Sequence, residues 1–249
     1  MRSLLIAPAD EQRLAEALTS GADAIIVDLA GAAPARRAGA RDAATRFLKE
    51  MRRQGGGPAL IVRTHAVDSG ETDADLDDVM AGAPEAILLP GSLGAASVQQ
   101  LSAKLAVREA KFALADGETR IIAVADTAQS LFQMESYLGS STRLIGIAWS
   151  AEALRADIGA ETGRDHLGGA LGPYRLAREL TLLAATSARV AAIDTAFPNI
   201  RDLGGLRAEA LAARRDGFTG KIALDPAQVD VINDVFPSRS MSIAKGSRS

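Results

Sequence analysis

The chain has no cysteine among its 249 residues, and it has only two histidines and one tryptophan. The absence of cysteine excludes a structural disulfide, a thiolate zinc site and a cysteine nucleophile. A chain without disulfides fits a reducing compartment, so we expect a cytoplasmic protein.

The sequence also lacks the features that direct a chain to a membrane or to nucleic acid. No uncharged apolar stretch reaches the roughly 18 residues of a membrane-spanning helix. The first apolar run ends at Pro8, too early for the core of a secretory signal. The net charge of −3 gives no general attraction to polyanions. We therefore expect neither a membrane nor a nucleic acid as partner.

Eight short apolar runs alternate along the chain with amphipathic, alanine-rich segments. The runs are continuous rather than alternating with polar residues, which is typical of parallel strands buried on both faces. They span residues 4–6, 24–27, 59–62, 86–89, 121–124, 144–148, 190–193 and 222–224. The intervening helices are expected at 10–20, 35–53, 72–82, 95–106, 127–138, 173–186 and 202–216.

Eight strand–helix units in about 250 residues predict an α/β protein with the TIM (β/α)8 barrel fold. We expect one domain over residues 1–237 and a polar, flexible tail over 238–249. The alternative is an open doubly wound sheet, but none of the runs is followed by its glycine-rich GxGxxG fingerprint.

A barrel of this kind places its chemistry at the carboxyl ends of the strands. Asp28 and Arg63 follow directly on predicted strands, and His65 and Asp126 lie within three residues of a strand end. Arg63 is expected either to bind a carboxylate or to form a salt bridge across the barrel mouth. His65 is interpreted either as a general base or as a loop histidine without a role. Aspartate at a strand end is also a common helix N-cap, so we expect about half of such acids to be caps.

Short motifs run in a fixed order along nearly the whole chain. They include Arg2-Ser3, Asp28-Leu29, Val62-Arg63, Leu89-Pro90, Asp126-Thr127-Ala128, Trp149-Ser150-Ala151-Glu152, Ala192-Ile193-Asp194 and Asp225-Pro226-Ala227-Gln228. In this order and spacing they resemble the citrate lyase β-subunit family, within the larger group of HpcH/HpaI-type aldolases. The resemblance implies a TIM barrel, a homo-trimer or homo-hexamer, and aldol- or Claisen-type cleavage of a carbon–carbon bond. The implied substrates are small carboxylates or their CoA thioesters, with magnesium as the metal.

The resemblance also assigns roles to residues of this chain. It implies that Arg63 binds the substrate carboxylate, with Ser150 and Ala151 as further substrate-binding candidates. Asp28 and His65 are catalytic candidates because of their positions at strand ends. Asp126 stands where the family has a glutamate ligand, so Asp126 with the nearby Glu152 is the candidate magnesium site. Magnesium prefers oxygen ligands and needs only one or two carboxylates beside its waters.

Several positions depart from the family pattern, and most of them belong to the active site. Ala153 stands where the family has its metal-binding aspartate, and Asp28-Leu29-Ala30-Gly31 replaces an Asp-Leu-Glu-Asp motif. The family's Pro-Lys is replaced by Pro90-Gly91. Asp225 replaces a histidine near the end of the barrel, and His65 replaces an asparagine two residues after the arginine. Lys221 lies at the start of a strand, where a Schiff-base lysine is not expected. These departures predict a degenerate site.

Two functions therefore stay open. The first is a citrate-lyase-β-like lyase with an altered metal site, and its alternative is an inactive family member that serves as a binding or scaffold subunit. A metal-independent hydrolase using the same pocket is a third, weaker hypothesis.

Overall fold

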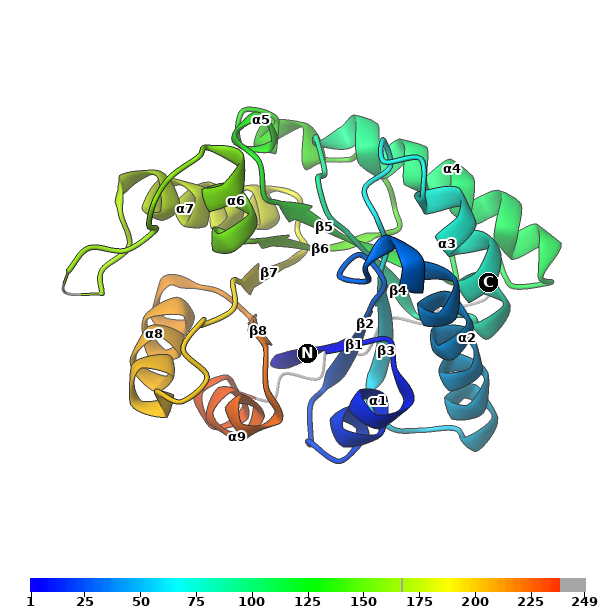
Figure 1. Ribbon diagram of the computed structural model, residues 1–249. Coiled ribbons are helices and arrows are strands. Elements are labelled where there is room, and N and C mark those ends of the chain that lie inside the picture. The colour runs from blue at the N-terminus through cyan, green and yellow to red at the C-terminus, as the bar shows by residue number, and fades with distance from the viewer. Residues whose placement is uncertain (167, 238–249) are drawn as a thin grey trace.

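Eight parallel strands close into a barrel in the computed structural model, which describes residues 1–166 and 168–237 (Figure 1). The strands are β1 (Ser3–Pro8), β2 (Ala24–Asp28), β3 (Ala59–Arg63), β4 (Ala86–Leu89), β5 (Arg120–Ala125), β6 (Leu144–Trp149), β7 (Ala191–Asp194) and β8 (Gly220–Ala223). Because β1 pairs with both β2 and β8, the sheet has no edge. The predicted TIM barrel is confirmed and the open sheet is excluded. The tail predicted at 238–249 lies outside the described residues.

Helices surround the barrel on its outer side (Figure 1). They are α1 (Glu11–Leu18), α2 (Arg37–Gln54), α3 (Thr72–Val79), α4 (Ala95–Lys111), α5 (Ala128–Leu131), α6 (Ala151–Asp157), α7 (Gly172–Ser187), α8 (Leu203–Asp216) and α9 (Pro226–Val235), with 3-10 turns η1 (Pro34–Arg36), η2 (Met80–Gly82) and η3 (Met134–Tyr137). The helix expected at 127–138 is broken into α5 and η3. Helices α6 and α9 were not predicted. Within the described residues, none of the helices has the length and apolarity needed to cross a membrane.

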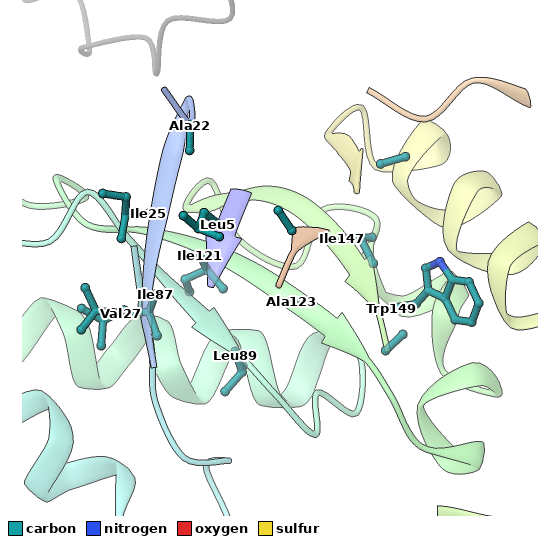
Figure 2. Close-up of a cluster of buried hydrophobic side chains, with 14 of the residues drawn as sticks. Leu5, Ala22, Ile25, Val27, Ile87, Leu89, Ile121, Ala123, Ile147 and Trp149 are labelled. Atoms are coloured by element: carbon teal, nitrogen blue, oxygen red, sulfur yellow. The ribbon is translucent and has the colours of Figure 1, made fainter. Parts of the chain in front are cut away.

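The alternation of side chains along each strand produces two separate cores. One cluster consists of strand residues and fills the barrel interior, with Leu4, Ile26, Ile61, Val124 and Ile193 among its members. The larger cluster joins the other face of the strands to the helices, and Figure 2 shows part of it around β2, β4, β5 and β6. Both faces of every strand are therefore buried, which explains the continuous apolar runs.

The same alternation decides which strand-end residues face the mouth. Asp28 continues the inward series of Ala24 and Ile26, and Asp126 that of Ile122 and Val124. Arg63 follows Ile61 in the same way. Asp194, Lys221 and Trp149 belong to the opposite series, which faces the helices.

Candidate active site

Arg63 and Asp28 form an ion pair at the barrel mouth. They are the last residues of β3 and β2 and lie opposite each other in the strand register. Arg63 Nη1 donates to both oxygens of Asp28, at 3.3 and 3.2 Å. Nε and Nη2 of Arg63 make no hydrogen bond within the described part of the chain. The salt bridge that was one of the two interpretations of Arg63 is thus present. The Nε and Nη2 donors of its guanidinium are still available to a ligand carboxylate.

Gly31 helps to place the carboxylate of Asp28. Its backbone N–H donates to Asp28 Oδ1 at 3.1 Å. A Cβ at position 31 would lie 2.5 Å from Asp28 Oδ2, closer than real Cβ contacts allow. A side chain here, as in the family's Asp-Leu-Glu-Asp motif, would push the Asp28 carboxylate from its present position. Gly31 therefore leaves room for the Asp28 carboxylate in the position where it pairs with Arg63.

Asp126 is the third inward-facing charged residue of the mouth. It directly follows β5, is only 6% exposed, and accepts a hydrogen bond from the Gly91 backbone N–H at 2.9 Å. The hydroxyl of Thr127, not the carboxylate of Asp126, caps α5. By contrast Asp225 does cap α9. The N-cap expectation is therefore correct for Asp225 and wrong for Asp126, whose carboxylate belongs to the mouth.

Burial raises the pKa of Asp126 to about 6. The Gly91 N–H and the positive charge of Arg63 oppose this shift, while the charge of Asp157 adds to it. A carboxyl group with such a pKa changes its charge close to neutral pH. It can accept a proton as a base and return it as an acid, which a carboxylate in water does poorly at this pH.

Replacing Asp126 with asparagine should stabilise the protein above neutral pH. The unfolded carboxyl has the ordinary pKa of 3.8 and the folded one about 6, so the native state holds the extra proton between these values. Stability therefore falls as pH rises from about 4 to about 6, by at most about 3 kcal/mol. Urea unfolding should show Asp126→Asn more stable by roughly 1–3 kcal/mol at about pH 8 and unchanged near pH 4. The exposed Asp68→Asn is the control, and equal pH profiles for wild type and Asp126→Asn would contradict the shift.

The other predicted residues of this region are already engaged in the framework. Ser150 caps α6 by accepting from the Ala153 N–H at 3.2 Å. The Ala151 N–H donates to Thr195 Oγ1 at 3.1 Å, so it is not free for a substrate. Glu152 points away: its side chain is 79% exposed and pairs with Arg155. The structure does not bring Glu152 together with Asp126.

The mouth does not fit a magnesium ion held by two carboxylates. The residue at the family's metal-binding aspartate is Ala153, and Asp157, one turn further along α6, accepts from the Ala128 N–H at 2.7 Å. Asp28 is paired with Arg63, whereas Asp126 has no cationic partner at bonding distance among the described residues. Across residues 1–166 and 168–237 no group of three or more histidine, aspartate or glutamate side chains is arranged to hold a metal.

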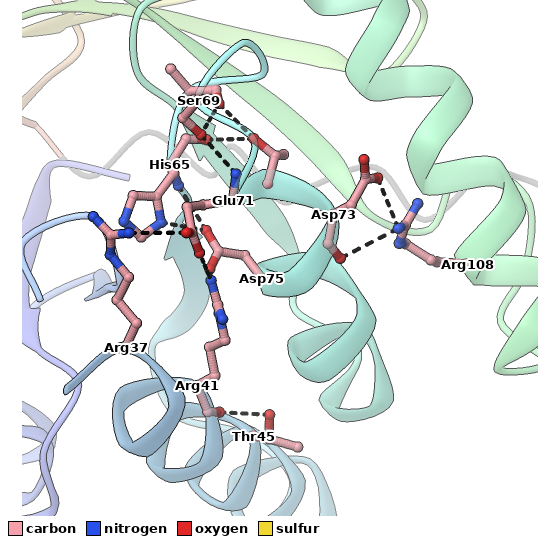
Figure 3. Close-up of polar contacts among 11 residues, drawn as sticks. Arg37, Arg41, Thr45, His65, Ser69, Glu71, Asp73, Asp75 and Arg108 are labelled. Carbon is pink, nitrogen blue, oxygen red and sulfur yellow. Dashed lines mark hydrogen bonds and ion pairs between the residues drawn. The ribbon is translucent and has the colours of Figure 1, made fainter. Parts of the chain in front are cut away.

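His65 is embedded in a polar cluster that sequence reasoning missed. Its Nδ1 lies 2.8 Å from Asp75 Oδ2, and Asp75 also pairs with Arg41 (Figure 3). Glu71 completes the cluster by pairing with Arg41 and Arg37. A signal was available: the two arginines and the two acids are each four residues apart, which places each pair on one helical face. Nothing in the sequence, however, indicated that the two faces meet.

Known proteins resemble this chain over nearly its whole length. A profile of the HpcH/HpaI aldolase/citrate lyase family matches residues 2–226. Citrate lyase subunit beta of Leuconostoc mesenteroides subsp. cremoris is 29% identical over 94% of this chain and 76% of that protein. A (3S)-malyl-CoA thioesterase of Cereibacter sphaeroides is 30% identical over 99% and 81%. The citrate lyase beta subunit of M. tuberculosis, solved with oxaloacetate and magnesium, has a TM-score of 0.79 at 28% identity, covering 94% of this chain and 96% of the other.

Proposed function

Because the chain belongs to the HpcH/HpaI aldolase/citrate lyase family, we propose that it cleaves a carbon–carbon bond in a small hydroxy carboxylate or its CoA thioester. The observation that carries this proposal is the trio of inward-facing charged residues at the mouth: Arg63 held by Asp28, and Asp126, whose pKa the charge of Arg63 lowers. The names of the relatives, one solved with oxaloacetate and one a malyl-CoA thioesterase, support the same substrate class.

Arg63 binds the carboxylate of the substrate in this proposal. Its unused Nε and Nη2 edge matches the two oxygens of a carboxylate, and the ion pair with Asp28 fixes the direction of the guanidinium. Asp28 thus acts as a positioning residue for Arg63. Ser150, whose hydroxyl proton is free to donate, is proposed as a further polar contact.

Asp126 moves the proton. In its ionised form it accepts the proton of the substrate hydroxyl, and the bond between the hydroxyl-bearing carbon and its neighbour then breaks. The electron pair of that bond passes to the neighbouring thioester as an enolate, while the hydroxyl carbon becomes an oxo acid. Protonated Asp126 returns the proton to the enolate carbon, so protons and electrons balance without an added reagent.

No step of this proposal is assigned to magnesium. The M. tuberculosis relative was solved with that metal, but of the two inward-facing carboxylates of this mouth Asp28 is paired with Arg63, which leaves Asp126 alone. The proposed site is therefore an altered one, in which a cationic side chain and a proton-transferring acid remain.

A binding or scaffold subunit without turnover is the second candidate function. Ala153 in place of the family's metal-binding aspartate favours it, because the alanine side chain can neither ligate a metal nor donate or accept a proton. In this case Arg63 would still bind carboxylates, but no bond would be broken.

The proposed chemistry predicts turnover of malyl-CoA to acetyl-CoA and an oxo acid in the presence of a chelator, measured by chromatography of the CoA products. Turnover should rise with pH through about 6, because ionised Asp126 is the base. Asp126→Asn should reduce it by roughly 100-fold or more. The exposed Asp68→Asn makes the same chemical change away from the inward-facing residues and is the matched control. Binding of malyl-CoA without turnover would favour the second candidate function, a binding or scaffold subunit. Unchanged turnover in Asp126→Asn would contradict the role of Asp126.

We also propose a cytoplasmic homo-oligomer, a trimer or hexamer, with residues 1–237 as one domain. Exposed apolar side chains support an assembly. Phe132, Leu138 and Leu183 are all exposed, on or beside α5, η3 and α7, and α7 contacts both of the other two elements.

A further inference from the structure

A partly buried charge cluster joins the helices that follow β2 and β3. Arg37 and Arg41, in the first two turns of α2, pair with Glu71 and Asp75 at the start of α3 (Figure 3). Arg41 Nε donates to Asp75 Oδ1 at 2.7 Å, and these two side chains are 11% and 0% exposed. Burying an ion pair costs desolvation, so its presence is weak evidence for a role in stability alone. The cluster therefore calls for a role beyond holding two helices together.

Asp75 also holds the chain just beyond Arg63. Its Oδ2 accepts the backbone N–H of His65 at 2.8 Å and lies 2.8 Å from His65 Nδ1. A carboxylate paired with an arginine is an acceptor only, so Nδ1 carries the proton of the neutral ring. Two donors of one residue, one from the backbone and one from the side chain, thus point at a single buried oxygen. This geometry fixes His65, two residues after Arg63, against α3.

Thr72 fixes the same short segment by its carbonyl groups. The Thr72 hydroxyl lies 3.1 Å from the carbonyl oxygen of His65 and 2.6 Å from that of Ala66, and it donates to them. The residue is only 1% exposed. The N–H and the C=O of His65 are therefore both held by side chains of α3, and the position of α3 determines where the loop after β3 begins.

The cluster is connected to the β2 side of the mouth as well. The Leu29 N–H, directly after Asp28, donates to the Arg63 carbonyl at 2.9 Å. From Leu29 the chain leads through η1 to Arg37, the first residue of α2. The two members of the ion pair, Asp28 and Arg63, are thus each followed by a loop that ends on the cluster. Pairing the arginines of α2 with the acids of α3 keeps the ends of these two loops in fixed positions.

We infer that Asp75 is a positioning residue for Arg63. Through His65 it fixes the end of β3, and through Arg41 it fixes that end relative to α2. The Arg63 guanidinium thereby keeps its ion pair with Asp28 and the direction of its Nε and Nη2 donors. A planar fork binds a carboxylate well only in the correct orientation, and binding groups must be held to within about 0.5 Å by their surroundings. This inference rests on the proposed function, because it requires Arg63 to hold the ligand.

The positioning role predicts an effect of Asp75 on binding that depends on Arg63. Asp75→Asn keeps the size of the side chain and an oxygen for the His65 N–H, but it removes the charge that holds Arg41. We expect calorimetry to show malate binding weakened by about tenfold in Asp75→Asn. In the Arg63→Ala background the same change should alter the affinity by less than about twofold, because the group that Asp75 positions is then absent.

Turnover of malyl-CoA gives a second measure of the same role. In Asp75→Asn we expect KM to rise by about tenfold and kcat to stay within about threefold of wild type, since the proton-transferring Asp126 is untouched. A general loosening of the barrel would lower kcat as well.

Glu109→Gln is the matched control for a loss of stability. Glu109 is 1% exposed, pairs with Arg143 and accepts the Thr119 backbone N–H, so it makes the same kinds of contact as Asp75. It lies at the other end of the barrel, where Arg143 and Thr119 directly precede β6 and β5. Both variants should lose stability in urea unfolding, but Glu109→Gln should bind malate as wild type does.

The contact between Asp75 and His65 can be observed without any ligand. Because the chain has only two histidines, ¹⁵N-histidine labelling gives two sets of ring signals, and His166→Asn assigns them. We expect the Nδ1–H form for His65 in neutral to mildly alkaline buffer, and a mixture of forms in Asp75→Asn. An Nε2–H form in the wild-type protein would overturn the inference.

The outcomes separate this inference from the proposed function. Unchanged affinity in Asp75→Asn, an equal effect with and without Arg63, or an equal loss in Glu109→Gln overturns the positioning role, while carboxylate binding by Arg63 stands. Failure of wild type to bind malate contradicts the proposed function and the positioning role with it. Thr72→Val retains the ion pairs and replaces Asp75→Asn if that variant does not fold. It should weaken malate binding by about threefold, and unchanged binding would overturn the inference.

Discussion

Arg63→Ala should weaken the binding of malate and of oxaloacetate by about 30-fold or more. The substrate carboxylate would lose a charge-assisted contact, and truncating one partner of such a pair costs about 2–5 kcal/mol. The negative charge of Asp28 would at the same time face the ligand without its partner. Calorimetry with each acid measures the effect.

Two further variants identify the cause of the loss at position 63. Arg63→Lys keeps the charge but not the planar fork, and it should recover only part of the affinity. Arg53→Ala removes an arginine in the last turn of α2 whose side chain is 77% exposed, and should bind as wild type. Unchanged affinity in Arg63→Ala would contradict the carboxylate site. Asp28→Asn combined with Arg63→Ala separates lost attraction from the repulsion of unpaired Asp28.

Lys221→Met should lower the free energy of unfolding by about 3 kcal/mol, because it removes the nearest cation of the buried Asp194 carboxylate. Arg178 Nε remains, but at 3.6 Å from Asp194 Oδ1. The Lys221 side chain is fully buried, and Nζ donates to Asp194 Oδ2 at 2.7 Å, to the Thr195 carbonyl at 2.7 Å and to Glu209 Oε1 at 2.9 Å. Asp194 in turn accepts from the Trp149 indole N–H at 2.9 Å. These ion pairs and hydrogen bonds link β7 and β8 to α8 on the side of the strands that faces the helices.

Urea unfolding of Lys221→Met, with the exposed Lys49→Ala as control, checks this effect. The control should lie within about 0.5 kcal/mol of wild type. A Lys221→Met protein with full stability but no turnover would contradict the structural role and assign a chemical one to the lysine. The sequence argument against a Schiff base used only the position of Lys221 at a strand start. The structure adds that its three acceptors leave no proton of the ammonium group free.

The fold could be predicted from the sequence because its signal is local. Runs such as 24–27 and 86–89 are continuous and apolar since each strand is buried on both faces, and their number and spacing fit a barrel. The short helix α6 gave no such signal, because a segment of seven residues covers too few turns for a periodic pattern.

The candidate site was predictable only where one strand end carries the information. Arg63, Asp28 and Asp126 could be placed at the mouth because they lie at or directly after the ends of β3, β2 and β5. The sequence does not predict which of their charges form an ion pair, since that depends on the strand register. The pairing of His65 with Asp75 joins a strand end to a helix, and the outward direction of Glu152 depends on the first turn of α6. Both are set by packing between segments, which one sequence does not reveal.

We propose that this family member binds its carboxylate through Arg63 and not through a magnesium ion. Calorimetry of the chelator-stripped protein with oxaloacetate, in the presence and absence of magnesium, tests it most directly. We predict the same affinity under both conditions, and in both a loss on Arg63→Ala. Binding of oxaloacetate only when magnesium is present would contradict the account and would show that Asp126 still holds the metal.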